Sequence, residues 1–191
     1  MKCNLETADV LLSAALSAAR LPADIRAGAL ESIAAPVYLT DASGRLTHYN
    51  AACISFAGRV PTPGEDRWCV TWRLYTTAGH PLPHEECPMA VAVRERREVR
   101  GMEALAERPD GSRVRFRPFP TPLYTEDGDF AGAVNVMIDV TDRRRAEDLR
   151  YQAARCRRLL TCTSDSQAIE ALRALAAEYD AEAERLVATL N

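Results

Sequence analysis

The chain has 191 residues, of which 47% are hydrophobic and 27% charged, and its formal net charge is −3. This composition is typical of one globular domain with appendages, and it lacks the concentrated basic face that nucleic acid or an acidic membrane would require. No apolar run approaches the roughly 20 residues that cross a bilayer. The six cysteines, without a secretion signal, indicate reduced thiols. We therefore expect a cytoplasmic protein with no membrane or nucleic-acid partner.

Hydrophobic spacing and turn residues define the elements of the N-terminal third. Pro22 separates two helices, and the turn Asp41–Gly44 joins two short strands. Asn50 precedes a further short helix and is expected to cap its N-terminus. The predicted elements are helices at 6–20 and 23–34, strands at 37–40 and 45–49, and a short helix at 51–58.

The middle of the chain combines a long loop with one helix. Residues 59–83 contain four prolines and two glycines, which predict a loop anchored into the core by Trp68, Trp72 and Leu74. A helix is expected from His84 to Arg97, with Pro88 in its first turn.

Residues 98–142 predict a meander of three strands, because two turn signals, Arg108–Gly111 and Glu126–Asp129, separate segments of alternating character. Pro118, Pro120 and Pro122 also alternate, so their missing N–H groups all face the same neighbouring strand. We expect regular pairing to fail on that side from about Pro118 onward, leaving a bulge or gap.

Two helices are predicted after the meander, at 142–160 and 166–190, with Ser164, Asp165 or Ser166 as the cap of the second. The short connection favours an antiparallel hairpin. Its two apolar stripes would face each other, leaving some apolar residues outside, and exposed apolar area favours a homodimer through the terminal helices. The first stripe is Ala146, Leu149, Ala153, Cys156 and Leu160; the second is Ala168, Leu172, Leu175, Tyr179, Ala183, Leu186 and Leu190. The residues left outside are Leu159, Ile169, Ala176 and Val187.

Several segments together resemble the PAS (Per-Arnt-Sim) sensor family over roughly residues 30–145. They are the first hairpin PVYLTDASGRLTHYN at 36–50, the segments W-C-x-x-W and P-L-P-H-x-x-C-P-M-A, the turn R-P-D-G, and the ending D-V-T-D-R. The resemblance implies an α+β PAS fold with a five-stranded antiparallel sheet and short helices on one face, plus an N-terminal helix and a C-terminal helical hairpin. The expected divisions are residues 1–29, 30–141 and 142–191.

In cofactor-binding PAS relatives, one residue of the last strand faces the ligand, two positions before the Asp of D-V-T. That residue is Met137 here, and Asn135 lies on the same face of the strand. We expect Asn135, Met137, Trp72 and Tyr38 to line a ligand site. The Asn135 amide must find partners in protein, water or ligand, because a bare buried amide costs about 1–3 kcal/mol. The ligand itself stays unknown, with haem or another small molecule as candidates.

Cys69, His84 and Cys87 form the sharpest candidate site. The spacing of His84 and Cys87 would place both on one helical turn, and PAS topology could bring Cys69 near them. Such a set could ligate zinc, iron or haem, could act as a redox thiol, or could simply pack.

No catalytic motif accompanies these residues, because the sequence has no phosphate-binding glycine loop, nucleophile elbow or H-E-x-x-H segment. We expect a sensor or adaptor domain that binds a small ligand or partner and has no enzymatic activity. Its expected partners are a second copy of itself and signalling proteins such as a histidine kinase or response regulator. The alternatives are a haem- or metal-linked redox sensor using Cys87 with His84 or Cys69, and a purely structural dimerisation module.

Overall fold

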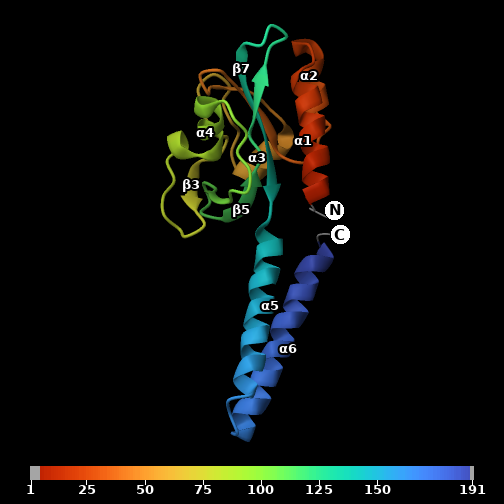
Figure 1. The fold of residues 1–191 in the computed structure, drawn as a ribbon, viewed down its shortest axis with the longest axis vertical. Coiled ribbons are helices and arrows are strands. Elements are labelled where there is room, and N and C mark those ends of the chain that lie inside the picture. The colour runs from red at the N-terminus through yellow and green to blue at the C-terminus, as the bar shows by residue number, and fades with distance from the viewer. Residues whose placement is uncertain (1–4, 190–191) are drawn as a thin grey trace. The chain divides into compact units, whose positions relative to one another are not determined.

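The structure is a computed structural model that describes residues 5–189, with side chains at 8–188. The described chain divides into two compact units, residues 5–139 and 140–189 (Figure 1). Within the described residues, no helix is both long and apolar enough to span a membrane.

The first unit has a mixed architecture around one antiparallel sheet. The strands run in the order β2-β1-β7-β5-β4-β3, and β6 also pairs with β7. The helices are α1 (Leu5–Ala19), α2 (Ala23–Glu31), α3 (Ala51–Ala57), the 3₁₀ turn η1 (His84–Glu86) and α4 (Pro88–Glu95). The strands are β1 (Val37–Asp41), β2 (Leu46–Tyr49), β3 (Arg73–Thr76), β4 (Ala104–Glu107), β5 (Arg113–Pro118), β6 (Thr121–Tyr124) and β7 (Phe130–Asp139).

The α+β class and the antiparallel sheet are confirmed, but the expected count of five strands is too low. One additional strand, β3, forms inside the segment predicted to be loop and pairs with β4. The prolines and glycines of that segment lie on either side of β3, so their density hid a four-residue run that can extend the sheet.

The remaining difference comes from a break between β5 and β6. Pro118 pairs with Met137 and Thr121 with Val134, so the same register with β7 continues across the break (118 to 121 against 137 to 134). Pairing of β5 with β4, by contrast, ends at Phe116. Phe119 donates its N–H to Val136 O at 2.9 Å, so odd-numbered residues donate toward β7. The prolines at even positions would have donated toward β4. The predicted one-sided loss of pairing is confirmed.

The two faces of the sheet are covered by different helices (Figure 1). On the inner face, α3 and α4 enclose a core that includes Tyr38, Phe116, Met89 and Met137. On the outer face, α1 contacts β7 and α2 contacts β2. The buried side of α1 consists mainly of alanines, which allow a helix to approach a sheet closely. The N-terminal helix thus covers the sheet of its own chain, without requiring a second copy.

Asn50 ties the N-terminal segment to this sheet, and its expected role as a helix cap is wrong. Its side chain makes no capping bond to α3. Instead Oδ1 accepts from Val37 N at 3.0 Å, and Nδ2 donates to the carbonyl oxygens of Leu30, Ile33 and Ala35 at 3.3, 3.0 and 2.8 Å. Asn50 is 1% exposed, and it satisfies backbone groups at the sharp entry from α2 into β1, where only the Leu30 carbonyl also accepts a backbone bond, from Ile33 N, among the contacts described.

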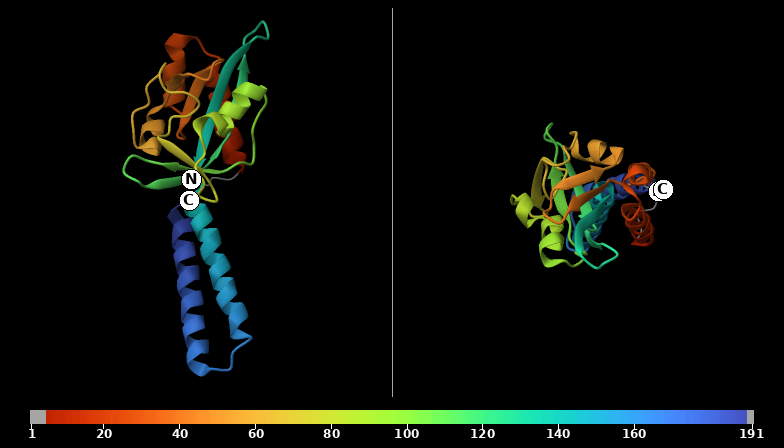
Figure 2. Two further views of the ribbon diagram at one scale, coloured as in Figure 1. Left: turned by 90° about the vertical axis from the view of Figure 1, so that its left-hand side faces the viewer. Right: turned by 90° about the horizontal axis from the view of Figure 1, so that it is seen from above.

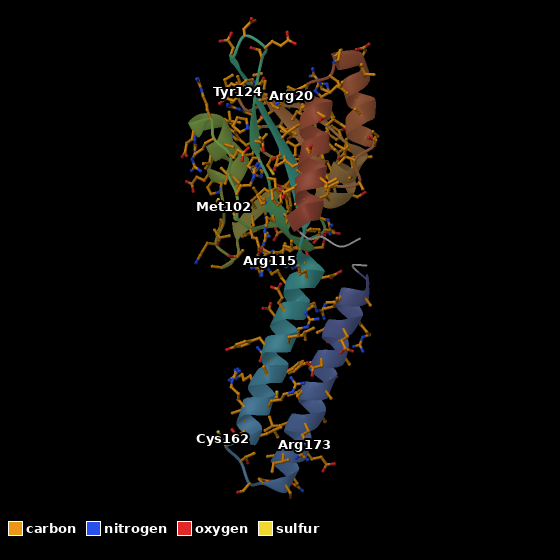
Figure 3. All side chains as sticks on the ribbon, turned by 45° about the vertical axis from the view of Figure 1, so that its right-hand side comes forward. Arg20, Met102, Arg115, Tyr124, Cys162 and Arg173 are labelled. Carbon is orange, nitrogen blue, oxygen red and sulfur yellow. The ribbon has the colours of Figure 1, made fainter. Side chains whose placement is uncertain are left out.

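The second unit is an antiparallel helical hairpin, as predicted, formed by α5 (Thr141–Leu160) and α6 (Ser166–Thr189), which Figure 2 shows side by side. Asp165 is the cap of α6, because its Oδ1 accepts from Gln167 N at 2.8 Å and Ala168 N at 3.2 Å. Cys162 is exposed in the connection (Figure 3). Arg145 pairs with Glu182 at 2.6 Å, and Arg157 pairs with Asp180.

The buried seam of the hairpin differs from the predicted one at Leu175 and Ala176, and Ile169 and Val187, which were expected outside, are half-buried. Its core is Ala153, Cys156 and Ala176, with Leu172 and Tyr179 packed against it. Ala176 was expected outside and Leu175 inside, but Ala176 is 4% exposed and Leu175 37%. Two helices that approach through small residues place the alanine between them and turn the adjacent leucine outward. Leu159 is 47% exposed, as expected. Leu190 lies outside the described residues.

We predict that Asn50→Ala lowers the free energy of unfolding by about 2–4 kcal/mol, because it leaves one buried donor and several buried acceptors without partners. Urea denaturation followed by circular dichroism measures the change. Ser164→Ala, in the exposed connection of the hairpin, is the control and should stay within about 0.5 kcal/mol. A loss for Asn50→Ala below 1 kcal/mol would contradict the role assigned to its side chain.

Candidate functional site

A buried pair of polar side chains links the two central strands on the inner face. Tyr38 of β1 lies directly opposite Asn135 of β7. Asn135 Nδ2 donates to Tyr38 Oη at 3.1 Å, and Asn135 Oδ1 accepts from Phe119 N at 2.9 Å, at the break between β5 and β6. Tyr38 is 0% and Asn135 2% exposed. The Asn135 amide therefore finds its partners within the protein.

The pair continues to a cluster of sulfur atoms. Tyr38 Oη donates to Trp68 O at 2.9 Å, and the same carbonyl lies 3.9 Å from Cys87 Sγ. Burial raises the pKa of Tyr38 well above its usual value, and the neighbouring Cys69 and Cys87 raise it further, Cys69 also through a hydrogen bond. Burial, reinforced by Cys69, raises the pKa of Cys87 to about 12. Tyr38 and Cys87 are therefore protonated at neutral pH.

From Cys69 the contacts lead outward to a histidine. The Thr71 hydroxyl donates to Cys69 Sγ at 3.1 Å and lies 3.4 Å from His84 Nε2. Burial lowers the pKa of His84 below its usual value, so the imidazole is neutral at pH 7. Cys69, Thr71 and His84 line an open pocket of about 350 Å³ whose other lining residues are Arg59, Glu65, Asp66, Arg67, Trp68 and Glu85. A polar chain thus runs from this surface pocket to the central strand.

A strained backbone holds the middle of this chain in place. Trp68 has φ of 66°, a left-handed conformation that few non-glycine residues adopt. Its indole packs on Gly44 so closely that a Cβ there would lie 1.9 Å from Trp68 Cζ3, and Trp68 N donates to Gly44 O at 2.8 Å. Such strain persists only where the surroundings enforce it. Here the conformation presents the Trp68 carbonyl to Tyr38 and Cys87.

Comparisons with known proteins identify the fold in which these polar contacts lie. A family model described as the PAS fold matches residues 30–145, more than half of the sequence. The chain belongs to the PAS fold family. No curated protein matches it.

Solved PAS domains of low identity also match. A PAS domain from Colwellia psychrerythraea is 19% identical, with a TM-score of 0.42, and the match covers 62% of this chain and 96% of that one. The PAS domain of the fruit-fly ELK potassium channel is 14% identical, with a TM-score of 0.48 and coverages of 64% and 99%. The PAS domain of Bordetella pertussis BvgS is 17% identical, with a TM-score of 0.41 and coverages of 67% and 96%.

Within this PAS domain, two of the four expected ligand-lining residues belong to the polar chain and two do not. Met137 is buried in the inner-face core, and its N–H donates to Pro36 O at 2.9 Å. Trp72, expected as a core anchor, is 41% exposed and lies under the guanidinium of Arg73 at 4.1 Å. Trp72 precedes β3 and is not paired with β4, so the alternation that turns Leu74 inward does not extend to it.

The expected helix from His84 to Arg97 is also different, because the 3₁₀ turn η1 ends at Glu86 and Cys87 is extended, with φ −66° and ψ 159°. A residue before proline avoids the helical conformation, and Cys87 precedes Pro88. His84 and Cys87 are therefore joined by a single 3₁₀ turn, closed by Cys87 N donating to His84 O at 3.2 Å, and the α-helix begins only at Pro88. No three His, Cys, Asp or Glu side chains among residues 8–188 are arranged to hold a metal. The role of Cys69, His84 and Cys87 as metal or haem ligands stays a prediction.

Thr71 belongs to this polar chain of side chains but was not predicted from the sequence. In the segment W-C-V-T-W, Cys69 and Thr71 are two residues apart, and an extended backbone places such residues on the same side. That spacing is the signal that could have found it.

We predict that Tyr38 and Asn135 are energetically coupled. Tyr38→Phe should lower the free energy of unfolding by about 1–2 kcal/mol and Asn135→Ala by about 2–3 kcal/mol, with the double variant falling short of their sum by at least about 0.5 kcal/mol. Urea denaturation of the four proteins measures this coupling. Tyr75→Phe, whose hydroxyl contacts Glu107 at 3.4 Å, is the control and should be additive with Asn135→Ala. Additivity of Tyr38→Phe with Asn135→Ala would show that the hydrogen bond carries no net energy.

Proposed function

We propose that this PAS domain is a signalling sensor that detects a small polar ligand or a partner at the His84 pocket and relays that event to β7. The single observation that supports the proposal is the set of contacts that runs from His84 through Thr71 to Cys69 and, through the carbonyl of its neighbour Trp68, to Tyr38 and Asn135. A ligand that bonds to His84 changes what the Thr71 hydroxyl can donate to. That change passes from Cys69 to Tyr38 and then to the side-chain amide of Asn135 on β7. The same amide accepts a hydrogen bond from Phe119 N.

The output of the proposed sensor is mechanical rather than catalytic. β7 ends at Asp139, and α5 begins two residues later at Thr141, so a shift of β7 along its length acts on the start of the hairpin. The polar side chains that could serve in acid–base chemistry are bound to one another, and the Cys87 thiol is protonated at neutral pH. A signalling protein that recognises the hairpin, such as a histidine kinase or response regulator, would receive the signal.

Protonation of His84 imitates a ligand and provides a direct test of the relay. Because burial lowers its pKa, His84 becomes protonated only as the pH falls below 6.5. The imidazolium can only donate to the Thr71 oxygen, so it no longer competes with Cys69 Sγ for the hydroxyl proton. We expect the side-chain amide resonances of Asn135 to shift with the same midpoint as the His84 ring signals in an NMR titration. Stability should also fall below pH 6.5, because the unfolded chain binds this proton more readily.

Thr71→Val separates the relay from a general effect of pH. It removes the hydroxyl between His84 and Cys69, so His84 should still titrate while the Asn135 resonances no longer follow. Thr47→Val, whose hydroxyl donates to Leu39 O on β1, is the matched control and should behave as the unmodified protein does. An Asn135 response that survives Thr71→Val would refute the relay.

We also propose that the hairpin forms a homodimer, because its own seam is narrow. Ala153, Cys156 and Ala176 bury little apolar area, while Tyr151, Leu159 and Leu175 are 61%, 47% and 37% exposed. A cytoplasmic location accompanies this proposal, since all five cysteines among the described residues are unpaired thiols, as expected in a reducing compartment.

Light scattering on the full chain and on variants of the hairpin tests whether the protein is a dimer. The full chain should be a dimer, and both a chain ending at Arg145 and the double variant Leu159→Glu/Leu175→Glu should be monomers, because each removes the exposed apolar surface of the hairpin. Arg155→Glu/Arg173→Glu changes charge on the same helices and is the control that should stay dimeric. A monomeric full chain would refute the dimer, and a dimeric truncated chain would move the interface to the first unit.

A further inference from the structure

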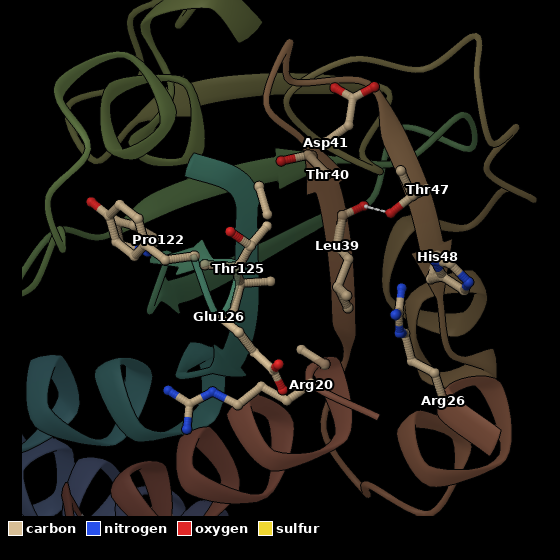
Figure 4. Close-up of a pocket in the computed structure, with 14 residues that line it drawn as sticks. Arg20, Arg26, Leu39, Thr40, Asp41, Thr47, His48, Pro122, Thr125 and Glu126 are labelled. Atoms are coloured by element: carbon tan, nitrogen blue, oxygen red, sulfur yellow. Dashed lines mark hydrogen bonds between the residues drawn. The ribbon is translucent and has the colours of Figure 1, made fainter. Parts of the chain in front are cut away.

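A second and larger pocket lies on the outer face of the sheet, opposite the polar chain. It has a volume of about 640 Å³ and is open on one side. The end of α1 and the start of α2 form one wall, β1 and β2 form the floor, and β6 with the turn after it forms the other wall (Figure 4). It is therefore enclosed by the N-terminal helices and not by the helices of the inner face.

Arg26 reaches this pocket with its guanidinium already fixed. Its Nε and Nη2 both donate to Leu21 O, at 3.1 and 3.0 Å, and the side chain is half-buried. Across residues 8–188 no partner is found for its Nη1. An arginine held in this way retains a donor that needs no ordering when it binds an anion.

His48 presents an unsatisfied atom next to this guanidinium (Figure 4). It is opposite Leu39 in the β1–β2 register and so lies on the outer face with it. Its Nδ1 is buried and has no hydrogen-bond partner among the described residues. Burial and the charge of Arg26 lower the pKa of His48. His48 also lines the pocket, so its ring reports on a ligand that binds there.

The rest of the pocket suits a carbon skeleton. Leu39, Pro122 and Leu123 supply an apolar strip along the floor and the far wall. The two acidic residues of the lining do not oppose an anion at Arg26. The Asp41 carboxylate already accepts from Ser43 and Arg45 and lies at the other end of β1 in Figure 4, while Glu126 lies on the side of Arg20.

We propose that this pocket binds a small organic carboxylate. A carboxylate oxygen accepts from Arg26 Nη1, and the carbon chain lies on Leu39 and Leu123. The ligand would bridge α2 and the outer face of β1 and β2. This site is separate from the proposed sensor pocket, since it uses none of its residues, and either can fail without the other.

The histidines allow a direct test, because the chain contains only three. Butyrate added to the full-length protein should shift the ring signals of His48 in a saturable way, and should leave those of His84 unchanged. The pKa of His48 should rise in the complex, because a carboxylate stabilises the imidazolium. Butyramide and inorganic phosphate, which lack the charge and the carbon chain respectively, should each bind at least roughly tenfold more weakly.

Variants assign the contacts. Arg26→Gln should weaken butyrate binding roughly tenfold or more, and Leu123→Glu should do the same by placing a like charge on the apolar strip without touching the Arg26–Leu21 contact. Arg94→Gln, which removes an exposed arginine on α4, is the control and should leave binding unchanged. Unshifted ring signals of His84 show that each variant is folded.

Three results would overturn the proposal. One is no shift of His48 at tens of millimolar butyrate, and another is equal binding by Arg26→Gln and Arg94→Gln. The third is equal binding of phosphate or butyramide, because either would show that the pocket does not recognise a carboxylate joined to a carbon chain.

Discussion

The hydrogen-bonding demand of one buried amide organises the inner face of this PAS domain. Asn135 lies on the central strand, where an unsatisfied amide would be costly, and its two ends are satisfied in different directions. One end holds the backbone at Phe119, where the prolines interrupt the neighbouring strand. The other holds Tyr38, which in turn orders the Trp68 carbonyl. A single side chain thus couples the irregular point of the sheet to Trp68, whose backbone is strained.

The strand β1 serves both faces through the alternation of its side chains. Tyr38 points into the core and joins the polar chain, whereas Leu39 points to the opposite face and lies under the outer pocket. Since successive residues of one strand cannot move independently, a displacement of β1 caused on one face is felt on the other. If both proposed sites bind their ligands, β1 would join the two inputs, because it contributes residues to both faces and pairs with β7.

Features that follow from local periodicity were predictable from the sequence. Features that depend on the contacts of a side chain in the folded protein were not. The alternation of Val134, Val136 and Ile138 and the spacing of the prolines gave β7 and the one-sided pairing correctly, because both follow from backbone geometry alone. The continuous helix expected from His84 to Arg97 failed because Pro88 controls the backbone before it. Asn50 failed for another reason: its position suits a cap, but buried carbonyl groups from α2 compete for the same side chain.

The row of prolines after β5 has a consequence for how the molecule behaves in a crowded solution. An unpaired strand edge normally offers N–H donors and carbonyl acceptors to any other extended chain, and this is how sheets grow into aggregates. Here the edge that turns away from β7 has no donors at Pro118, Pro120 and Pro122. Its acceptor at Pro120 is already occupied by Val99 N and by the guanidinium of Arg100. The interruption that loosens the middle of the sheet therefore also denies a foreign strand the template it would need.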